Sequence, residues 1–335
     1  MKRFVCLFLF GLSLSVSSAM GATFYVGTCH SGSFSTISSA VNAVPAGSVI
    51  NVCLGEYDEQ VIISKSLTLQ GLSSQNPDEA KVIGFGNGST TQSLVLGLDL
   101  QPTIWIKSGT VTISNLHVSA SGPGASSCPL LPTTIFYASG ASGTVDHVTS
   151  LASTSTNQCA VGIWAENASL DASSIKIENS FIQADNFGIV SAGQQAEGFA
   201  PVLANTITGN TIDHTAHGIY LFQTRGKVSG NDIFYADGEG ISDSAYGIYQ
   251  NANATIITGN SFSGLYYGVI IAAPFATVTN NKIIQVVTGI DLGCFANGTV
   301  SGNIIDGDTG LLHAPSTFSG KNTFFLTPDV IQGGC

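Results

Sequence analysis

The chain has little charge, and positive charge is especially scarce. Only 9% of its 335 residues are charged, 10 Lys or Arg stand against 21 Asp or Glu, and the formal net charge is −11. Arg225 is the one arginine that follows Arg3. A surface this poor in positive charge repels nucleic acids and other polyanions, so we expect no nucleic-acid partner.

Long apolar runs are missing beyond the first residues. Lys2 and Arg3 precede an apolar run at 4–16 and small residues at 19–22, which predicts a secretory signal peptide over residues 1–22. A membrane anchor is the alternative, disfavoured because the run is short. No later stretch is long enough to span a bilayer, and no low-complexity linker divides the chain. We therefore expect a secreted protein, extracellular or periplasmic, with a single domain over residues 23–335 and no membrane span after signal removal.

What the chain does contain is a short phrase that recurs about every 21 residues. It reads apolar-x-Gly/Asn-Asn-x-apolar, and a Gly-apolar pair follows it. Apolar residues alternate with small polar ones, which is typical of strands with one buried face. Such a repeat predicts a solenoid, in which stacked coils build one continuous core. The repeat asparagines, spaced by 21, 29, 21, 22 and 19 residues, are Asn210, Asn231, Asn260, Asn281, Asn303 and Asn322.

We expect each asparagine at a corner between two strands, because Asn tolerates the left-handed backbone that a tight corner needs. Stacked coils would align these side chains in a column, about 4.8 Å apart, where their amides can form a hydrogen-bonded ladder. Three looser copies of the phrase place Asn115, His147 and Asn179 at the same corner.

The N-terminal part adds a second pattern. Residues 34–44 carry apolar side chains at helical spacing, and Pro-Ala-Gly at 45–47 ends that helix. A Gly-x-Tyr segment at 55–57 and a Leu-Thr-Leu-x-Gly segment at 67–71 follow. Together with the repeat, this entrance resembles the parallel β-helix proteins of the pectin-lyase-like superfamily, over about residues 23–320. The resemblance implies an all-β, right-handed parallel β-helix of about 10–11 coils with a short N-terminal capping helix. It says little of function, because one solenoid hosts many activities.

The cysteines favour disulfides over metal binding. No Cys-x-x-Cys pair occurs, so we expect no metal site. Cys6 is removed with the signal peptide, and six cysteines remain. An even number of cysteines in a secreted chain is typical of disulfide bonding. Six cysteines allow 15 pairings. Separations of about one coil favour Cys29 with Cys53 and Cys128 with Cys159, and Cys294 with Cys335 would tie down the tail.

Strand alternation predicts which side chains face outward. In each Gly-apolar strand the first apolar residue faces the core and the next one faces out. This places Trp164, Val190, Tyr220, Tyr249, Ile270, Asp291 and Leu312 side by side on one surface. The longest insertions flank that surface and form a groove. We expect it to bind substrate through the side chains of Trp164, Tyr220, Phe222, Tyr249, Glu166 and Asp291.

The same groove holds candidates for catalysis. Paired carboxylates can hydrolyse a glycoside, and a basic residue with a Tyr acid can serve a lyase. The candidates are Asp213, His217, Arg225, Asp237, Glu239 and Asp243. Each candidate also has a structural interpretation. The aromatic side chains would then merely cover the sheet, the acids would belong to a solvated loop, the histidines would be polar corner residues, and Arg225 would be a turn residue.

Family motifs do not decide the reaction. Three segments between 210 and 227 echo polygalacturonase motifs, but they crowd into one coil and no Asp-Asp pair exists. Pectin methylesterase signatures are absent, and Arg225 alone could supply the arginine of a pectate lyase, in which case calcium would be the cofactor. Our interpretation is a secreted protein that binds or acts on an extracellular polysaccharide. The alternative is a non-catalytic scaffolding β-helix, and the sequence leaves open whether the protein is an enzyme.

Overall fold

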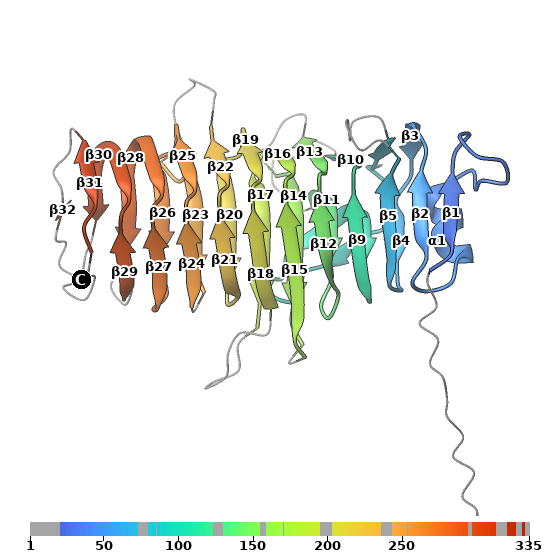
Figure 1. The fold of residues 1–335 in the computed structure, drawn as a ribbon, viewed down its shortest axis with the longest axis horizontal. Helices are drawn as coiled ribbons and strands as arrows, with labels where there is room; N and C mark the ends of the chain where they lie inside the picture. Colours follow the sequence, from blue (N-terminus) through green and yellow to red (C-terminus); the bar gives the residue numbers. More distant parts are fainter. Residues whose placement is uncertain are drawn as a thin grey trace, which may run out of the picture.

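The computed structural model is a solenoid of parallel strands (Figure 1). It describes residues 21–72, 80–84, 86–122, 130–154, 159–169, 171–194, 203–235, 243–252, 254–293, 297–312, 320–325 and 330–331. The expected signal peptide, except its last two residues, lies outside these ranges. No helix in the described part of the chain is long and apolar enough to cross a membrane.

Each coil contributes strands to three faces, which we call A, B and C in chain order. Face A is an 11-stranded parallel sheet. This number agrees with the predicted 10–11 coils and the right-handed parallel β-helix fold. Its strands are β1 (Thr23–Val26), β2 (Val49–Val52), β5 (Leu67–Gly71), β9 (Thr110–Ser114), β12 (Ser142–Asp146), β15 (Ser173–Glu178), β18 (Leu203–Thr208), β21 (Arg225–Ser229), β24 (Thr255–Thr258), β27 (Ala276–Thr279) and β29 (Gly298–Ser301).

Face B follows the asparagine corner. Its strands are β3 (Gly55–Asp58), β6 (Ala80–Ile83), β10 (His117–Gly122), β13 (Thr149–Thr154), β16 (Phe181–Ala184), β19 (Thr211–Asp213), β22 (Asp232–Phe234), β25 (Ser261–Ser263), β31 (Thr323–Phe325) and the first parts of β28 (Lys282–Leu292) and β30 (Ile304–Leu312).

Face C follows face B along the chain, and the last parts of β28 and β30 belong to it. Its other strands are β4 (Val61–Ile63), β8 (Asp99–Ile106), β11 (Leu131–Tyr137), β14 (Val161–Asn167), β17 (Phe187–Gly193), β20 (His217–Phe222), β23 (Tyr246–Asn251), β26 (Tyr267–Ile271) and β32 (Val330–Ile331). A two-residue strand, β7 (Thr91–Gln92), pairs antiparallel with β8.

The predicted asparagine column is present. In each of five successive pairs from Asn210 to Asn322, one Asn donates its side-chain Nδ2–H to the Oδ1 of the Asn in the next coil, at 2.9–3.0 Å. The backbone N–H of the donor residue meets the same oxygen. The five side chains from Asn210 to Asn303 are buried, so the ladder satisfies amide groups that would otherwise be costly inside the solenoid.

The corner itself differs from our expectation by one residue. A left-handed residue precedes each ladder asparagine from Asn210 to Asn303, with φ of 66° at Gly209 and 56° at Asn280. Asn179 occupies this earlier position, with φ of 50°, and Ser180 takes the ladder place by donating its backbone N–H to Asn210 Oδ1. Asn115 and His147 also have φ of 52°. These three residues are therefore corner residues and not members of the ladder.

The capping helix is confirmed as α1 (Ile37–Ala43). Thr36 caps it by accepting a hydrogen bond from the Ser39 backbone N–H at 3.1 Å. The carboxylate of Glu59 accepts the N–H groups of Ile37 and Ser38 at 2.6 and 2.8 Å. The helix N-terminus is thereby tied to the first coil, where α1 covers the open end of the core.

Three of the six cysteines that were predicted to form disulfides fall in the described residues. Cys29 and Cys53 are bonded, with their Cα atoms 5.7 Å apart, as predicted. Cys159 is also in a disulfide. Its predicted partner Cys128 lies outside the described residues, as do Cys294 and Cys335.

Candidate functional site

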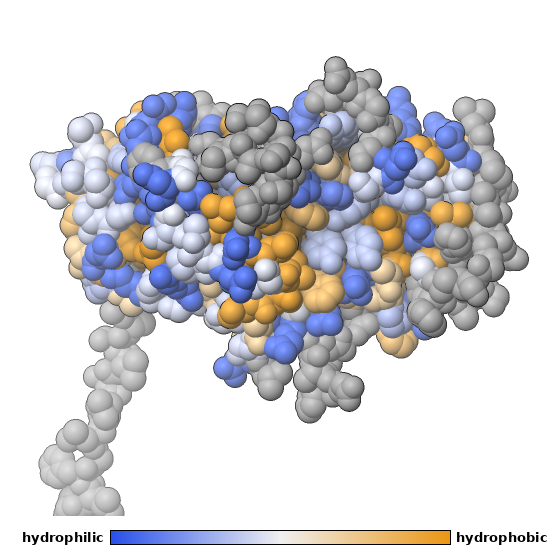
Figure 2. Space-filling view, turned by 180° about the vertical axis from the view of Figure 1, so that it is seen from behind, coloured by the Kyte–Doolittle hydropathy of each residue, from blue (hydrophilic) through white to orange (hydrophobic). Residues whose placement is uncertain are grey.

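The predicted outward row on face C exists. The register pairs Trp164 with Val190, Val190 with Tyr220, and Tyr220 with Tyr249. The row continues through Ile270, Asp291 and Leu312. Figure 2 shows the side opposite to Figure 1, where hydrophobic atoms gather midway along the solenoid between hydrophilic ones.

A second aromatic row runs beside the first. Phe187, His217, Tyr246 and Tyr267 occupy successive coils at the start of their strands. The rings of Phe187 and His217 are stacked with centroids 4.8 Å apart, and His217 and Tyr246 follow at 4.6 Å. Cross-contacts join this row to Tyr220, which lies 6.0 Å from Phe187.

Simple alternation missed this second row for a geometric reason. A Cβ placed on Gly218 would meet the core atom Ile233 Cγ2 at 2.7 Å, so Gly218 faces inward like Ile219. Two inward residues in succession leave His217 on the outer side, although strict alternation puts it in the core. The signal was available in the sequence: Phe, His, Tyr and Tyr stand directly before four of the Gly-apolar pairs.

We call the outward rings of β17, β20, β23 and β26 the aromatic surface. Tyr220 and Tyr249 stack at 5.4 Å with an interplanar angle of 22°, and Phe222 lies 6.3 Å from Tyr220 at 6°. Except for the buried Tyr246, these rings are partly exposed. The members are Phe187, His217, Tyr220, Phe222, Tyr246, Tyr249 and Tyr267.

The histidine in this surface is part of the ring stack. Its Nδ1 lies 2.9 Å from Asn186 Oδ1. Burial lowers the pKa of His217, and a hydrogen bond with Asn186 opposes that shift. The neutral ring is therefore favoured, and its contacts with Phe187 and Tyr246 are aromatic.

Two carboxylates lie at the C-terminal edge of the aromatic surface. Asp291 follows Ile270 in the outward row, and Asp243 is exposed shortly before β23. Burial raises the pKa of Tyr267, and the negative charges of Asp291 and Asp243 raise it further. The negative charges of Asp291 and Asp243 are therefore both felt by the Tyr267 hydroxyl, at the edge of the aromatic surface.

Other predicted catalytic residues lie elsewhere. Asp213 ends β19 on face B and pairs with His214 at 2.5 Å, before the corner at which His214 has φ of 51°. Arg225 begins β21 on face A and is exposed. The expected cluster of both with His217 is therefore wrong, because each corner turns the chain onto another face within a few residues. Asp237 and Glu239 lie outside the described residues.

Trp164 and Glu166 face outward from the coil, but both are buried. Their exposed fractions are 0% and 2%, so the expectation of an accessible indole and carboxylate was wrong. The cause is the turn between β7 and β8, residues 93–98, which we call the strap. Its Val95 and Leu96 pack against the apolar cluster that contains Trp164 and Val190.

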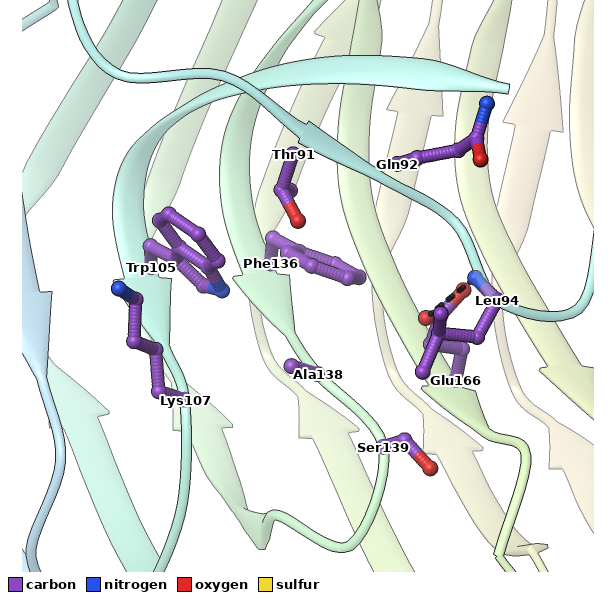
Figure 3. Close-up of a pocket in the computed structure, with 9 residues that line it drawn as sticks. All are labelled: Thr91, Gln92, Leu94, Trp105, Lys107, Phe136, Ala138, Ser139 and Glu166. Atoms are coloured by element: carbon purple, nitrogen blue, oxygen red, sulfur yellow. Dashed lines mark hydrogen bonds between the residues drawn. The ribbon is translucent and has the colours of Figure 1, made fainter. Parts of the chain in front are cut away.

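Glu166 anchors the strap. Its Oε2 accepts the hydroxyl of Ser93 at 2.5 Å. Its Oε1 accepts the backbone N–H of Leu94 at 3.0 Å, the bond drawn in Figure 3. Burial raises the pKa of Glu166, while the hydrogen bonds from Ser93 and Leu94 oppose the shift. Both carboxylate oxygens have partners, which makes Glu166 a structural link.

Two hollows flank the strap, and Leu94 lines both. The first, of about 270 Å³, lies on the N-terminal side between Trp105, Lys107, Phe136 and Glu166 (Figure 3). The ammonium of Lys107 lies 4.0 Å from the centre of the Trp105 ring. The second, of about 200 Å³, lies on the C-terminal side and adjoins the aromatic surface through Phe222.

Comparisons with known proteins confirm the fold. The chain has the parallel β-helix fold of solved structures to which it is similar. It is similar to XylC in a complex with xylose, at 12% identity and TM-score 0.54, over 91% of this chain and 70% of that one. It is also similar to a GH136 lacto-N-biosidase from Eubacterium ramulus, at 10% identity and TM-score 0.52, over 92% and 68% of the two chains. No curated protein sequence matches the chain.

A family model described as periplasmic copper-binding protein (NosD) matches residues 203–324, well under half of the chain. Histidine, cysteine and methionine are the side chains that favour copper. Both methionines of this chain, Met1 and Met20, lie outside the matched segment. Within the described ranges, no three His, Cys, Asp or Glu side chains come together as metal ligands. We therefore assign no step to a metal.

Proposed function

We propose that the protein is a secreted or periplasmic glycan-binding protein whose aromatic surface holds an uncharged polysaccharide. The observation that carries the proposal is the run of partly exposed rings at 5.4–6.3 Å steps, from Phe222 through Tyr220 to Tyr249. Aromatic faces pack against the apolar faces of sugar rings. Coils about 4.8 Å apart repeat at close to the length of one sugar ring.

The charge distribution favours an uncharged ligand. Asp291 and Asp243 border the aromatic surface, and the whole chain has a net charge of −11. An acidic polysaccharide would be repelled by both. Carboxylates at the edge can instead accept hydrogen bonds from sugar hydroxyl groups.

The Cys29–Cys53 disulfide supports an oxidising compartment, because such bonds persist in secreted and periplasmic proteins. The matched family model is itself described as periplasmic.

The test is a binding screen of the mature protein on neutral and acidic glycans. We expect binding to neutral glycans, and a loss of about tenfold or more in the Tyr220→Ala, Tyr249→Ala double variant. The matched control is Phe325→Ala, which removes an exposed ring from face B and should leave binding unchanged. Equal binding by the double variant would place the site elsewhere. No binding by the unmodified protein would favour the scaffolding alternative.

The same screen addresses catalysis. Paired carboxylates are the usual groups for glycoside hydrolysis, and Asp243 and Asp291 are the two acids whose charges act on Tyr267 at this surface. New reducing ends that disappear in both Asp243→Asn and Asp291→Asn would extend the proposal from binding to hydrolysis. Unsaturated products would instead indicate a lyase.

A further inference from the structure

We propose that the strap closes one end of the glycan site, so that the protein binds the end of a glycan chain and not its interior. The inference rests on the proposed function and specifies which part of the polysaccharide is recognised. It follows from where the outward row of face C is open and where it is sealed.

The outward row changes from open to sealed within one coil. Tyr220 and Tyr249 are partly exposed, whereas Val190 and Trp164, which continue the same row toward the N-terminus, are 1% and 0% exposed. The neighbouring position changes in the same way, from the partly exposed Phe222 to Ala192 at 0%. A glycan that lies on Tyr249 and Tyr220 therefore cannot continue along the sheet.

The barrier is well fastened. Residues 93–98 are joined to the body through Glu166, which is two coils away from Tyr220 in the register. At their base, the pairs Thr91–Leu100 and Gln92–Asp99 hold β7 against β8. Val95 and Leu96 pack onto the cluster around Trp164. Opening the strap would break two hydrogen bonds to a buried carboxylate and expose an apolar cluster, so binding a sugar is not expected to displace it.

The foot of the strap offers a place for the last sugar. The hollow of about 200 Å³ is lined by Leu94, Val95, Ala168, Gly193, Gln194, Phe222 and Gln223. Apolar groups and two amide side chains make up this lining, without any charged side chain. Amides donate to and accept from hydroxyl groups, and the volume suits a single ring better than the larger ligands that typical pockets enclose.

The rings lead into this hollow. Phe222 forms part of its wall, its ring lies nearly parallel to that of Tyr220, and Tyr249 continues the stack one coil farther. A chain with its terminal residue in the hollow would place its next units over Tyr220 and Tyr249. The terminal unit, the strap and the aromatic surface then form one blind-ended site for an uncharged sugar chain.

The experiment compares blocked and unblocked oligosaccharides by calorimetry on the full mature protein. The probes are hexasaccharides of β-1,4-glucose, β-1,4-xylose, β-1,3-glucose and α-1,4-glucose. Each is tested free, with the reducing end converted to its alditol, and with a benzyl group on the non-reducing terminal ring. A fourth form carries both modifications.

We expect one end modification to weaken binding by about tenfold or more, and the other to have little effect. A doubly modified hexasaccharide that binds as tightly as the free one would overturn chain-end recognition while leaving glycan binding intact. Failure of every free hexasaccharide to bind would remove the proposed function, and this inference with it.

A matched pair of variants locates the end. Phe222→Ala alters the hollow on the C-terminal side of the strap, and Lys107→Ala alters the hollow on the other side. We expect weaker binding only for Phe222→Ala. Weaker binding for Lys107→Ala would mean that the glycan crosses the strap, which would contradict a blind-ended site.

Discussion

The carboxylate of Glu166 accepts a hydrogen bond from the hydroxyl of Ser93, a residue 73 positions earlier in the chain, at 2.5 Å. This contact joins the strap to the middle of face C and hides the indole of Trp164 beneath it. The boundary between the sealed and the open part of the outward row depends on this link. Glu166 therefore shapes the proposed glycan site without touching the ligand.

The first prediction concerns the pH dependence of this link. Burial raises the pKa of Glu166 above its ordinary value of 4.5, so the folded state favours the protonated acid. The stabilisation from this group is fully present below about pH 4.5 and is lost as the pH rises through the raised pKa. The wild type should therefore lose stability relative to Glu166→Gln over this interval. Urea unfolding of both proteins between pH 4 and 8 measures the difference, and parallel curves would contradict the prediction.

The second prediction concerns the asparagine ladder. Asn281→Ala removes the side-chain bonds to Asn303 and to the Ile257 carbonyl, and it leaves the Asn260 amide groups without their acceptor. We expect a loss of about 2–4 kcal/mol in the free energy of unfolding. The matched control is the adjacent Asn280→Gly, which should change it by less than about 1 kcal/mol, since glycine accepts a positive φ. Equal effects of the two substitutions would argue against the ladder as the main stabilising feature.

The third prediction concerns the disulfides. Peptide mapping of the unreduced protein should recover Cys29 linked to Cys53, and Cys159 linked to Cys128. Cys159 linked to Cys294 or Cys335 would show that our pairing is wrong. Closing the 24-residue separation between Cys29 and Cys53 should stabilise the protein by about 3 kcal/mol, measured as the difference between the wild type and Cys29→Ser, Cys53→Ser.

The fourth prediction concerns the ring stack. Burial lowers the pKa of His217 below its ordinary value of 6.5. A group with a depressed pKa stabilises the fold above pH 6.5, and this stabilisation is lost as the pH falls through the lowered value. His217→Phe keeps an aromatic ring between Phe187 and Tyr246 but cannot be protonated. The variant should show less acid destabilisation than the wild type between pH 7 and 4, and identical pH profiles would contradict a buried, neutral histidine.

Local sequence patterns predicted most of the fold. The spacing from Asn210 to Asn322 predicted the stacked coils, because every coil must return to the same corner for its apolar residues to share one core. The corner was placed one residue too late, since glycine and asparagine both suit a left-handed position and their adjacency does not show which of them occupies it. Alternation likewise predicted the outward row from Trp164 to Leu312, and it failed where two inward residues follow each other in a Gly-apolar pair, as at Gly218 and Ile219.

The repeat by itself determined the solenoid, its register and the side on which Tyr220 and Tyr249 lie, because these follow from interactions between neighbouring residues and adjacent coils. Only the tertiary structure decided that Trp164 and Glu166 are covered, that Arg225 and Asp213 belong to other faces, and that the aromatic surface ends at the strap. The physical reason is that the strap packs on coils more than 60 residues farther along the chain, as in the bond from Leu94 to Glu166 at a separation of 72 residues. No local pattern of polarity encodes a contact over such a distance, whereas burial of the apolar cluster and the need to satisfy a buried carboxylate select it in the folded chain.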